Sequence, residues 1–440
     1  MTSEIAVMNS LAIALAADSA VTVEHPEGHK IYNTVNKLFT LSKYHPVGIM
    51  VYGDAKLMGI PWEVVIKTYR SNLGKRKFDT LKEYAQDFIA FLESDSSFFP
   101  SSLQEAYFSA IVNSYYNRIK SEIDEQVHDI TECDGQIEFL RLQEIVTNTV
   151  QKHYEDWERM ETLPFASDDW IEEVIEKYKK LILDAKGAVF EQQPISEESL
   201  DQLMKLSVYL LCKDSGWGNY SGIVIAGFGD VEVFPSLTEF LCQFIVNSKL
   251  KYKEARDIKI DFGNDATIVP FAQQEMIKAF MEGVHPSYLD TLESYLTELF
   301  DQYPEKIVDA ISQVEESEKE PLIAKLKDLG KALLEEFIEQ MKAKRQIDYV
   351  SPVVDTVSIL PKDELAVMAE TFVNLTSFKQ KMSLDAETVG EPIDVAVISK
   401  GDGFVWIKRK HYFKPDLNWG FFENYFRTST SDTGGQNEWQ

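Results

Sequence analysis

Short apolar runs separated by turn residues fill the first part of the chain. EIAVM and LAIALAA lie on either side of Asn9-Ser10, and KLFTL and VGIMVY lie on either side of SKYHP. Short apolar runs rich in branched residues and bounded by turn residues are typical of buried strands. The pattern over residues 1–57 therefore predicts two β-hairpins.

Between residues 58 and 215 the apolar residues recur three and four positions apart, as in LKEYAQDFIAFLES and IEFLRLQEIVTNTVQKHYEDW. This spacing predicts amphipathic helices, and Pro61 suits a helix N-terminus. SGIVIAGFGD and VEVFPSL then return to a strand pattern. Gly227 and Gly229 indicate a turn or a close approach of two backbones.

Helical spacing resumes over residues 269–345 with FAQQEMIKAFMEGV and LDTLESYLTELFDQY. The highly charged stretch ISQVEESEKEPLIAKLKDLGKALLEEFIEQMKAKR follows them, and we interpret it as a solvated pair of amphipathic helices. After Pro361, DELAVMAETFVNLTSFKQKM predicts a further helix. PIDVAVIS and FVWIKRKHYF predict a strand pair across Lys400-Gly401-Asp402-Gly403.

Strand segments at both ends of the chain, with helices between them, favour an α+β fold whose middle has been expanded. The predicted division is a core of residues 1–57, 216–268 and 361–415, a helical layer with a large insertion over 58–215, further helices over 269–360, and a flexible tail over 428–440.

Composition narrows the classes of function. The chain is 44% hydrophobic, which favours a packed core over disorder. Its formal charge of −28 disfavours binding to nucleic acid or to an acidic membrane, and no apolar run is long enough to span a bilayer. Three scattered cysteines suit a reducing cytoplasm and no disulfide framework. The seven histidines show no metal-ligand spacing, so we expect neither a metal nor a cofactor.

Thr2 directly follows the initiator methionine. If Met1 is removed, the chain starts with a residue that carries both a hydroxyl nucleophile and an α-amino base, whose pKa of about 7.7–8.0 suits proton transfer at neutral pH. Many chains begin Met-Thr without any catalytic role, so Thr2 on its own is also read as an ordinary second residue.

Asp18 ends the strand that would pair with the N-terminal strand, and counting across the turn places it near the level of Thr2. A carboxylate there could hold the ammonium group of Lys37, which would lower the pKa of a neighbouring hydroxyl and amine. The alternatives are a turn cap for Asp18 and a solvated strand end for Lys37.

TSEIAVMNSLAIALAADSAVT resembles the mature N-terminus of proteasome β-subunits and of the related bacterial threonine protease, with Asp18 on the family's aspartate. VNKLFTLSKYHPVGIMVYGDAKL resembles the following strands of that family. The resemblance implies that Thr2 is the nucleophile and that Lys37 is the catalytic lysine, with Lys30 as a less favoured alternative. It also implies that the N–H of Gly53 contributes to an oxyanion hole.

LDAETVGEPIDVAVISKGDGFVWI resembles a late segment of the same family, with Asp385 as the supporting aspartate and Thr388 in place of a serine. The resemblance implies a four-layer αββα N-terminal-nucleophile hydrolase sandwich with helical insertions. It further implies a threonine-type peptidase or amidohydrolase that acts on a polypeptide or amide, forms a homo-oligomer and works with a separate ATPase unfoldase.

Several positions depart from the family pattern. Ala20 replaces a basic residue, Val389-Gly390 replaces a glycine pair, and Tyr52 stands where a small residue is usual. The serine that follows the central strands has no counterpart other than Thr267. These departures leave an alternative function open, namely a catalytically silent structural subunit whose helical insertions bind partners.

Overall fold

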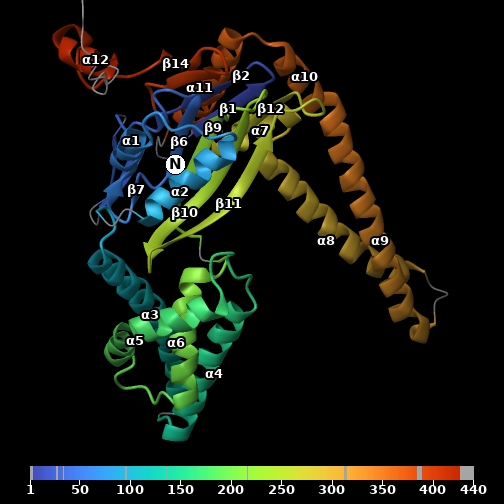
Figure 1. Ribbon diagram of the computed structural model, residues 1–440. Helices are drawn as coiled ribbons and strands as arrows, with labels where there is room; N and C mark the ends of the chain where they lie inside the picture. Colours follow the sequence, from blue (N-terminus) through green and yellow to red (C-terminus); the bar gives the residue numbers. More distant parts are fainter. Residues whose placement is uncertain are drawn as a thin grey trace, which may run out of the picture.

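The computed structural model describes residues 3–25, 28–32, 34–94, 97–134, 136–215, 217–311, 315–383 and 389–426. It is a mixed α and β structure built around antiparallel sheets (Figure 1). The first five-stranded sheet has the order β12 (Ala266–Ala272), β1 (Ser3–Asn9), β2 (Ala12–Ala17), β13 (Asp394–Ser399) and β14 (Gly403–Lys408). The second has the order β11 (Lys249–Lys259), β10 (Ser236–Val246), β9 (Ser221–Gly227), β6 (Val47–Gly53) and β5 (Leu38–Thr40).

The two sheets pack against each other through a buried apolar layer. On β1, Ala6 and Met8 point into this layer and meet residues of the second sheet such as Met50 and Val224. Because side chains alternate along a strand, the intervening residues of β1 face the other way, toward helices. Strands buried on both faces explain why EIAVM and LAIALAA are apolar almost throughout.

Helices cover the outer face of the first sheet. This layer consists of α7 (Glu275–Glu282), α10 (Ser351–Ile359) and α11 (Lys362–Lys381), and α11 contacts β1, β2 and β13. A buried cluster joins Ile5 and Val7 of β1 to Ala369, Phe372 and Val373 of α11.

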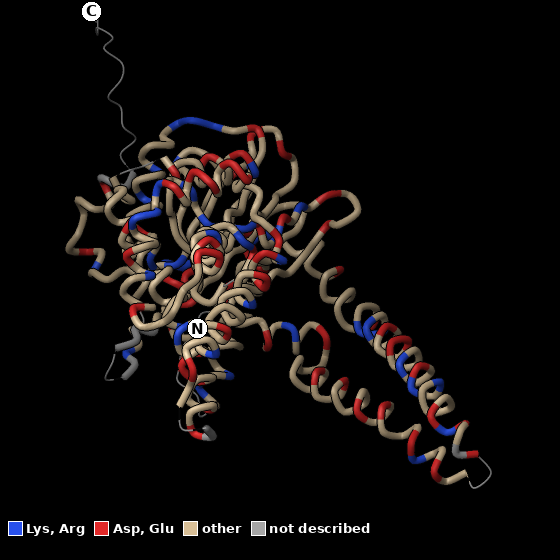
Figure 2. Tube along the Cα trace, turned by 90° about the horizontal axis from the view of Figure 1, so that it is seen from below, with Lys and Arg blue, Asp and Glu red and all other residues tan. Residues whose placement is uncertain are grey.

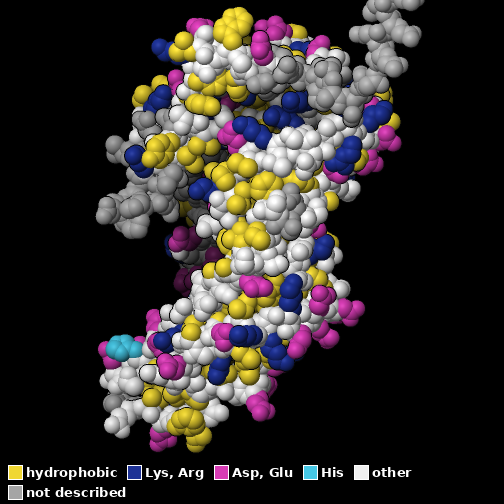
Figure 3. Space-filling model, turned by 60° about the vertical axis from the view of Figure 1, so that its left-hand side comes forward, with side chains coloured by type: hydrophobic (Ala, Val, Ile, Leu, Met, Phe, Trp, Pro, Cys, Tyr) yellow, Lys and Arg dark blue, Asp and Glu magenta, His cyan; other side chains and the backbone are white. Residues whose placement is uncertain are grey.

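The outer face of the second sheet carries α1 (Trp62–Leu73) and α2 (Leu81–Ser94) and then a larger helical bundle (Figure 1). The bundle consists of α3 (Ser101–Asp134), α4 (Phe139–Glu158), α5 (Asp168–Val189) and α6 (Glu197–Cys212). One buried cluster runs from the sheet through α1 and α2 into the bundle, so the bundle shares its apolar core with the sheet. Acidic and basic side chains lie interspersed on its surface (Figure 3).

A helical arm projects from the molecule apart from the bundle, on the right-hand side of Figure 1. It consists of α8 (Pro286–Ala310) and α9 (Glu316–Arg345), and a π-helical turn (Gln346–Val350) connects it to α10. The smaller elements are the hairpin of β3 (Val21–His25) with β4 (Gly28–Tyr32), the ribbon of β7 (Lys56–Leu57) with β8 (Ile60–Pro61), a 3-10 turn (Pro415–Leu417) and α12 (Trp419–Phe426).

The predicted pairs β1–β2, β5–β6 and β13–β14 are confirmed. The turn between β1 and β2 works without glycine because the side-chain oxygen of Asn9 accepts the N–H groups of Leu11 at 3.0 Å and Ala12 at 3.2 Å. The same amide donates to the carbonyls of Val357 and Leu360, both at 2.9 Å, so it also fixes α10 against the sheet.

Three predictions of elements are wrong. The helical stretch expected from residue 269 begins as a strand, because β12 continues to Ala272 and α7 starts only at Glu275. VEVFPSL is not a strand over most of its length: β10 starts only at Ser236, because the Glu232 carboxylate accepts the N–H groups of Gly229 at 2.6 Å and Leu81 at 2.9 Å and holds a turn there. The charged stretch that ends at Arg345 is also not a pair of helices. It forms the single helix α9, which packs against α8.

Candidate active site

Asp18 lies directly beyond β2, and its side chain is fully buried. One carboxylate oxygen accepts the backbone N–H of Ser3 at 3.0 Å, and the other accepts the N–H groups of Ala20 at 3.0 Å and Gly390 at 3.3 Å. The backbone N–H of Ser19 also donates to the carbonyl oxygen of Gly390 at 3.1 Å, which further holds Gly390 beside Asp18. Asp18 therefore ties the residue that follows Thr2 to the end of β2 and to the loop before β13.

Lys37 reaches the same carboxylate from the residue before β5. Its Nζ donates to Asp18 Oδ1 at 2.7 Å, and the lysine is only 4% exposed. Burial lowers the pKa of the Lys37 ammonium, and the nearby negative charges of Asp18 and Glu4 oppose that shift. A lysine whose pKa is lowered in this way exchanges a proton near neutral pH more readily than a solvated lysine does.

Gly53 ends β6 with a backbone φ of +75°. A Cβ at this position would lie 2.4 Å from the carbonyl oxygen of Tyr220, so only glycine fits the observed backbone. Gly53 lines the same cavity as Lys37, which brings two of the predicted site residues together.

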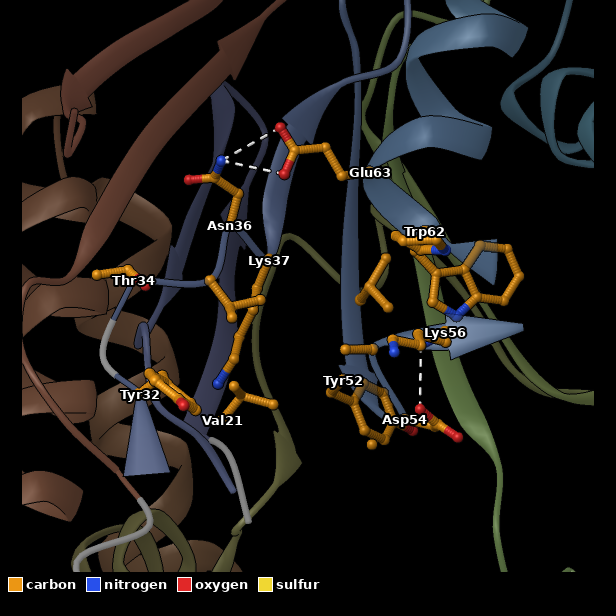
Figure 4. Close-up of a pocket in the computed structure, with 15 residues that line it drawn as sticks. Val21, Tyr32, Thr34, Asn36, Lys37, Tyr52, Asp54, Lys56, Trp62 and Glu63 are labelled. Carbon is orange, nitrogen blue, oxygen red and sulfur yellow. Dashed lines mark hydrogen bonds between the residues drawn. The ribbon is translucent and has the colours of Figure 1, made fainter. Parts of the chain in front are cut away.

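That cavity has a volume of about 420 Å³. Figure 4 shows Val21 and Lys37 on one side of it and Tyr52 and Trp62 on the other. Asp54, Lys56 and Glu63 also line it. The cavity thus combines apolar walls with charged groups and with the Nζ of a buried lysine.

Tyr52 is the bulkiest departure from the family pattern, and the structure accommodates it on β6. Its hydroxyl donates to the buried carboxylate of Glu239, whose other oxygen lies 3.0 Å from Nε of Arg256. Burial raises the pKa of the Tyr52 hydroxyl, so the phenol is neutral. The ring fits because Gly222 of β9 has no side chain: a Cβ there would lie 2.0 Å from the ring of Tyr52.

Glu4 is a residue of this region that the sequence reasoning missed. It lies one residue beyond Ser3, is fully buried, and neither of its carboxylate oxygens has a hydrogen-bond partner within the described part of the chain. Burial raises its pKa well above the ordinary value, although the charge of Lys37 partly opposes the shift. The sequence could have indicated Glu4, because an acidic residue inside an apolar run such as EIAVM is unusual.

Of the predicted site residues, Asp18, Lys37 and Gly53 are described, whereas Thr2, Asp385 and Thr388 lie outside the described residues. The alternative lysine, Lys30, is exposed on β4. Thr267 pairs with Met8 on β1, about 17 Å along the strand from Ser3 at the usual rise per residue. Thr267 therefore belongs to the far end of the sheet and not to this site.

Within the described residues no group of three or more His, Cys, Asp or Glu side chains is arranged to hold a metal ion. Every helix in the described residues is too short or too polar to cross a bilayer. No family model matches the chain, and no curated protein matches it significantly. The functional argument therefore depends on the geometry of the site and on the sequence resemblance.

Proposed function

We propose that this chain is a threonine-type peptidase or amidohydrolase of the N-terminal-nucleophile class, with Thr2 as its nucleophile after cleavage of the Met1–Thr2 bond. The observation that carries the proposal is the buried pair of Asp18 and Lys37 at 2.7 Å, because the same Asp18 carboxylate also accepts the N–H of Ser3, the residue after Thr2. This arrangement places a buried lysine and its carboxylate beside the start of the chain.

The proposed fold is the four-layer sandwich of that class. Two sheets that pack face to face, with helices over both outer faces, support this assignment. In this proposed fold, the α3–α6 bundle and the α8–α9 arm are insertions between the strands and helices that members of the class have in common.

In the proposed reaction Thr2 Oγ attacks the carbonyl carbon of a peptide or amide, and its proton passes to the α-amine of Thr2, directly or through a water molecule. Lys37 lowers the pKa of both groups, and Asp18 holds Lys37 in place. The Gly53 N–H stabilises the oxyanion. The α-amine then gives its proton to the leaving nitrogen, an ester to Thr2 remains, and water hydrolyses that ester.

The proposed roles of Asp385 and Thr388 come from the resemblance, in which they hold the α-amino end of Thr2. The Gly390 N–H bond to Asp18 supports this part of the proposal, because it fixes the segment directly after these two residues at the site. The apolar walls of the cavity favour a substrate with a bulky apolar side chain next to the bond that is cleaved.

The test is hydrolysis of an unfolded protein and of a fluorogenic peptide with an apolar residue before the scissile bond. Thr2→Ala removes the nucleophile and is expected to lower turnover by about 10³-fold or more, whereas Thr2→Ser keeps a hydroxyl and is the matched control. Equal turnover by Thr2→Ala and the unaltered chain would refute the mechanism. Inactivity of the unaltered chain after removal of Met1 would favour the silent structural subunit.

A further inference from the structure

The α8–α9 arm is an antiparallel helical hairpin that stands away from the sheets (Figures 1 and 2). Its helices meet closely where Gly330 lies against Phe300: a Cβ on Gly330 would be 3.2 Å from that ring. Lys327 of α9 also pairs with Asp301 and Glu305 of α8, at 3.4 and 3.0 Å. These contacts define the inner faces of the two helices.

A row of large apolar side chains on α8 is not used in this packing. Tyr288, Tyr295, Leu299 and Tyr303 are 62, 64, 42 and 54% exposed. At 3.6 residues per turn these four positions fall within roughly 80° of one another, about a quarter turn to one side of the inner row that contains Phe300. They form one exposed stripe along the helix.

Helix α9 carries a matching stripe. Leu329, Leu333, Phe337 and Met341 recur every four residues and are 57, 50, 44 and 38% exposed. Leu329, Leu333 and Phe337 lie before the inner position Gly330 in the helical rotation, as the α8 stripe lies before Phe300, and Met341 lies about 20° beyond Gly330. In two antiparallel helices that face each other, stripes displaced from the inner row in the same sense of rotation lie toward the same side of the pair. Both stripes are therefore on one side of the arm. We call these eight residues the arm face.

The size of the arm face is that of a protein interface. Eight large side chains exposed to this degree present on the order of 800 Å² of surface, taking about 150–250 Å² for a whole aromatic side chain. A stable complex buries about 800 Å² on each partner. An apolar surface of this extent on an isolated hairpin calls for a covering partner.

The charges on the arm favour one way of covering it. Helix α8 carries six acidic residues and one basic residue, whereas α9 carries seven of each sign (Figure 2). Two hairpins can stack through the arm face with α8 over α8 or with α8 over α9. The first arrangement opposes two strongly acidic helices, and the second places each α8 beside a helix rich in lysine.

We propose that the arm face binds the arm face of a second copy of this chain, with α8 of each copy over α9 of the other. The product is a four-helix bundle with a two-fold axis along the arms, in which both tips point the same way. This interface is independent of the proposed hydrolase activity, because it involves no residue of the Asp18–Lys37 site.

The test is the molar mass of the full-length chain in solution, measured by light scattering or sedimentation over a range of concentrations. The double variant Tyr295→Glu with Leu333→Glu places charges in the centre of the arm face and is expected to halve the mass of the assembly. The matched control is Thr297→Glu with Ala324→Glu, which adds the same charges on the opposite side of the arm and is expected to leave the mass unchanged. Circular dichroism checks that both variants keep their helix content.

The order of the helices is tested by cysteine pairing. Leu299→Cys combined with Leu333→Cys, two positions that are nearly level because Phe300 lies level with Gly330, is expected to give an oxidised product in which a peptide of α8 is joined to a peptide of α9 from another copy, at a yield that dilution of a preformed dimer does not reduce. A mass that is equal in the arm-face variant and the unaltered chain, or an unaltered chain that stays monomeric, would overturn the proposal. Predominant α8–α8 products would overturn the arrangement.

Discussion

At the scale of single residues, the site depends on charged groups that are buried together. Asp18 and Lys37 are both almost inaccessible, and each is the hydrogen-bond partner that compensates the other for the loss of water. Asp18 also accepts three backbone N–H groups, so its negative charge organises three separate parts of the chain.

Removing one member of this pair should strongly lower the free energy of unfolding, and removing both members should lower it much less. Lys37→Met leaves the Asp18 carboxylate buried without its cation and is expected to lower the free energy of unfolding by about 3–5 kcal/mol. Adding Asp18→Asn removes the unpaired charge and should restore a large part of that loss. Chemical denaturation of both single variants and the double variant measures the coupling, and strictly additive losses would contradict a direct ion pair.

Glu4 gives a prediction about pH. Its pKa is raised in the folded protein, so the folded state binds this proton more tightly than the unfolded chain, whose glutamate has a pKa of about 4.3. Its stabilising contribution is therefore present below that unfolded pKa and is lost as the pH rises through the folded value. Glu4→Gln keeps the shape without the titration and should be more stable than the unaltered chain at pH about 8, with a smaller advantage at pH about 5. Unfolding measured at both pH values checks this, and an equal difference at the two would contradict it.

At the scale of elements, β6 and β9 fit together because the large ring of Tyr52 on β6 lies against Gly222 on β9, which has no side chain. Gly222→Ala would place a Cβ against the ring of Tyr52, and overpacking of this kind costs about 1–3 kcal/mol. Removing the ring should remove the conflict, so Gly222→Ala is expected to cost much less in a Tyr52→Val background. Thermal or denaturant unfolding of the four proteins tests this, and an equal cost in both backgrounds would show that the ring is not the obstacle.

The sequence predicted those elements whose pattern is local and strong. The β1–β2 hairpin follows from two apolar runs around Asn9, and the α1–α5 segments follow from their three- and four-residue spacing. The hairpin of β10 and β11 was not predicted, because β11 mixes charged with apolar residues. Its turn signal was present in Asn247 and Ser248, which adopt φ values of +52° and +57°.

The site shows the same limit. The position of Asp18 opposite the start of β1 could be inferred by counting residues across a hairpin, because that counting is local, whereas the approach of Lys37 from the other sheet was expected only from the family resemblance. The neighbourhood of Glu4 could not be inferred in this way, since Glu239, whose charge acts on Glu4, comes from the distant strand β10 of the other sheet. A single acidic residue in an apolar strand signals a special environment but does not identify its neighbours.

At the scale of the whole molecule, the two helical insertions differ in how they are built. The α3–α6 bundle continues the buried core of the second sheet. The α8–α9 arm leaves apolar residues such as Tyr295 and Leu333 exposed far from the sheets. The first insertion extends the core, and the second is the one that we propose joins two copies of the chain. The chain's formal charge of −28 opposes association elsewhere on its surface, which makes an apolar arm a suitable place for contact.

The central claim is that Thr2 becomes the first residue of the chain and is acylated during the reaction. The most direct measurement incubates the protein with an activated ester of an apolar dipeptide, quenches the reaction with acid, and determines the mass of the N-terminal proteolytic fragment. We predict a fragment that begins at Thr2 and carries one acyl group, and a Thr2→Ala protein that carries none. Retention of Met1, or an acyl group on any other residue, would contradict the account.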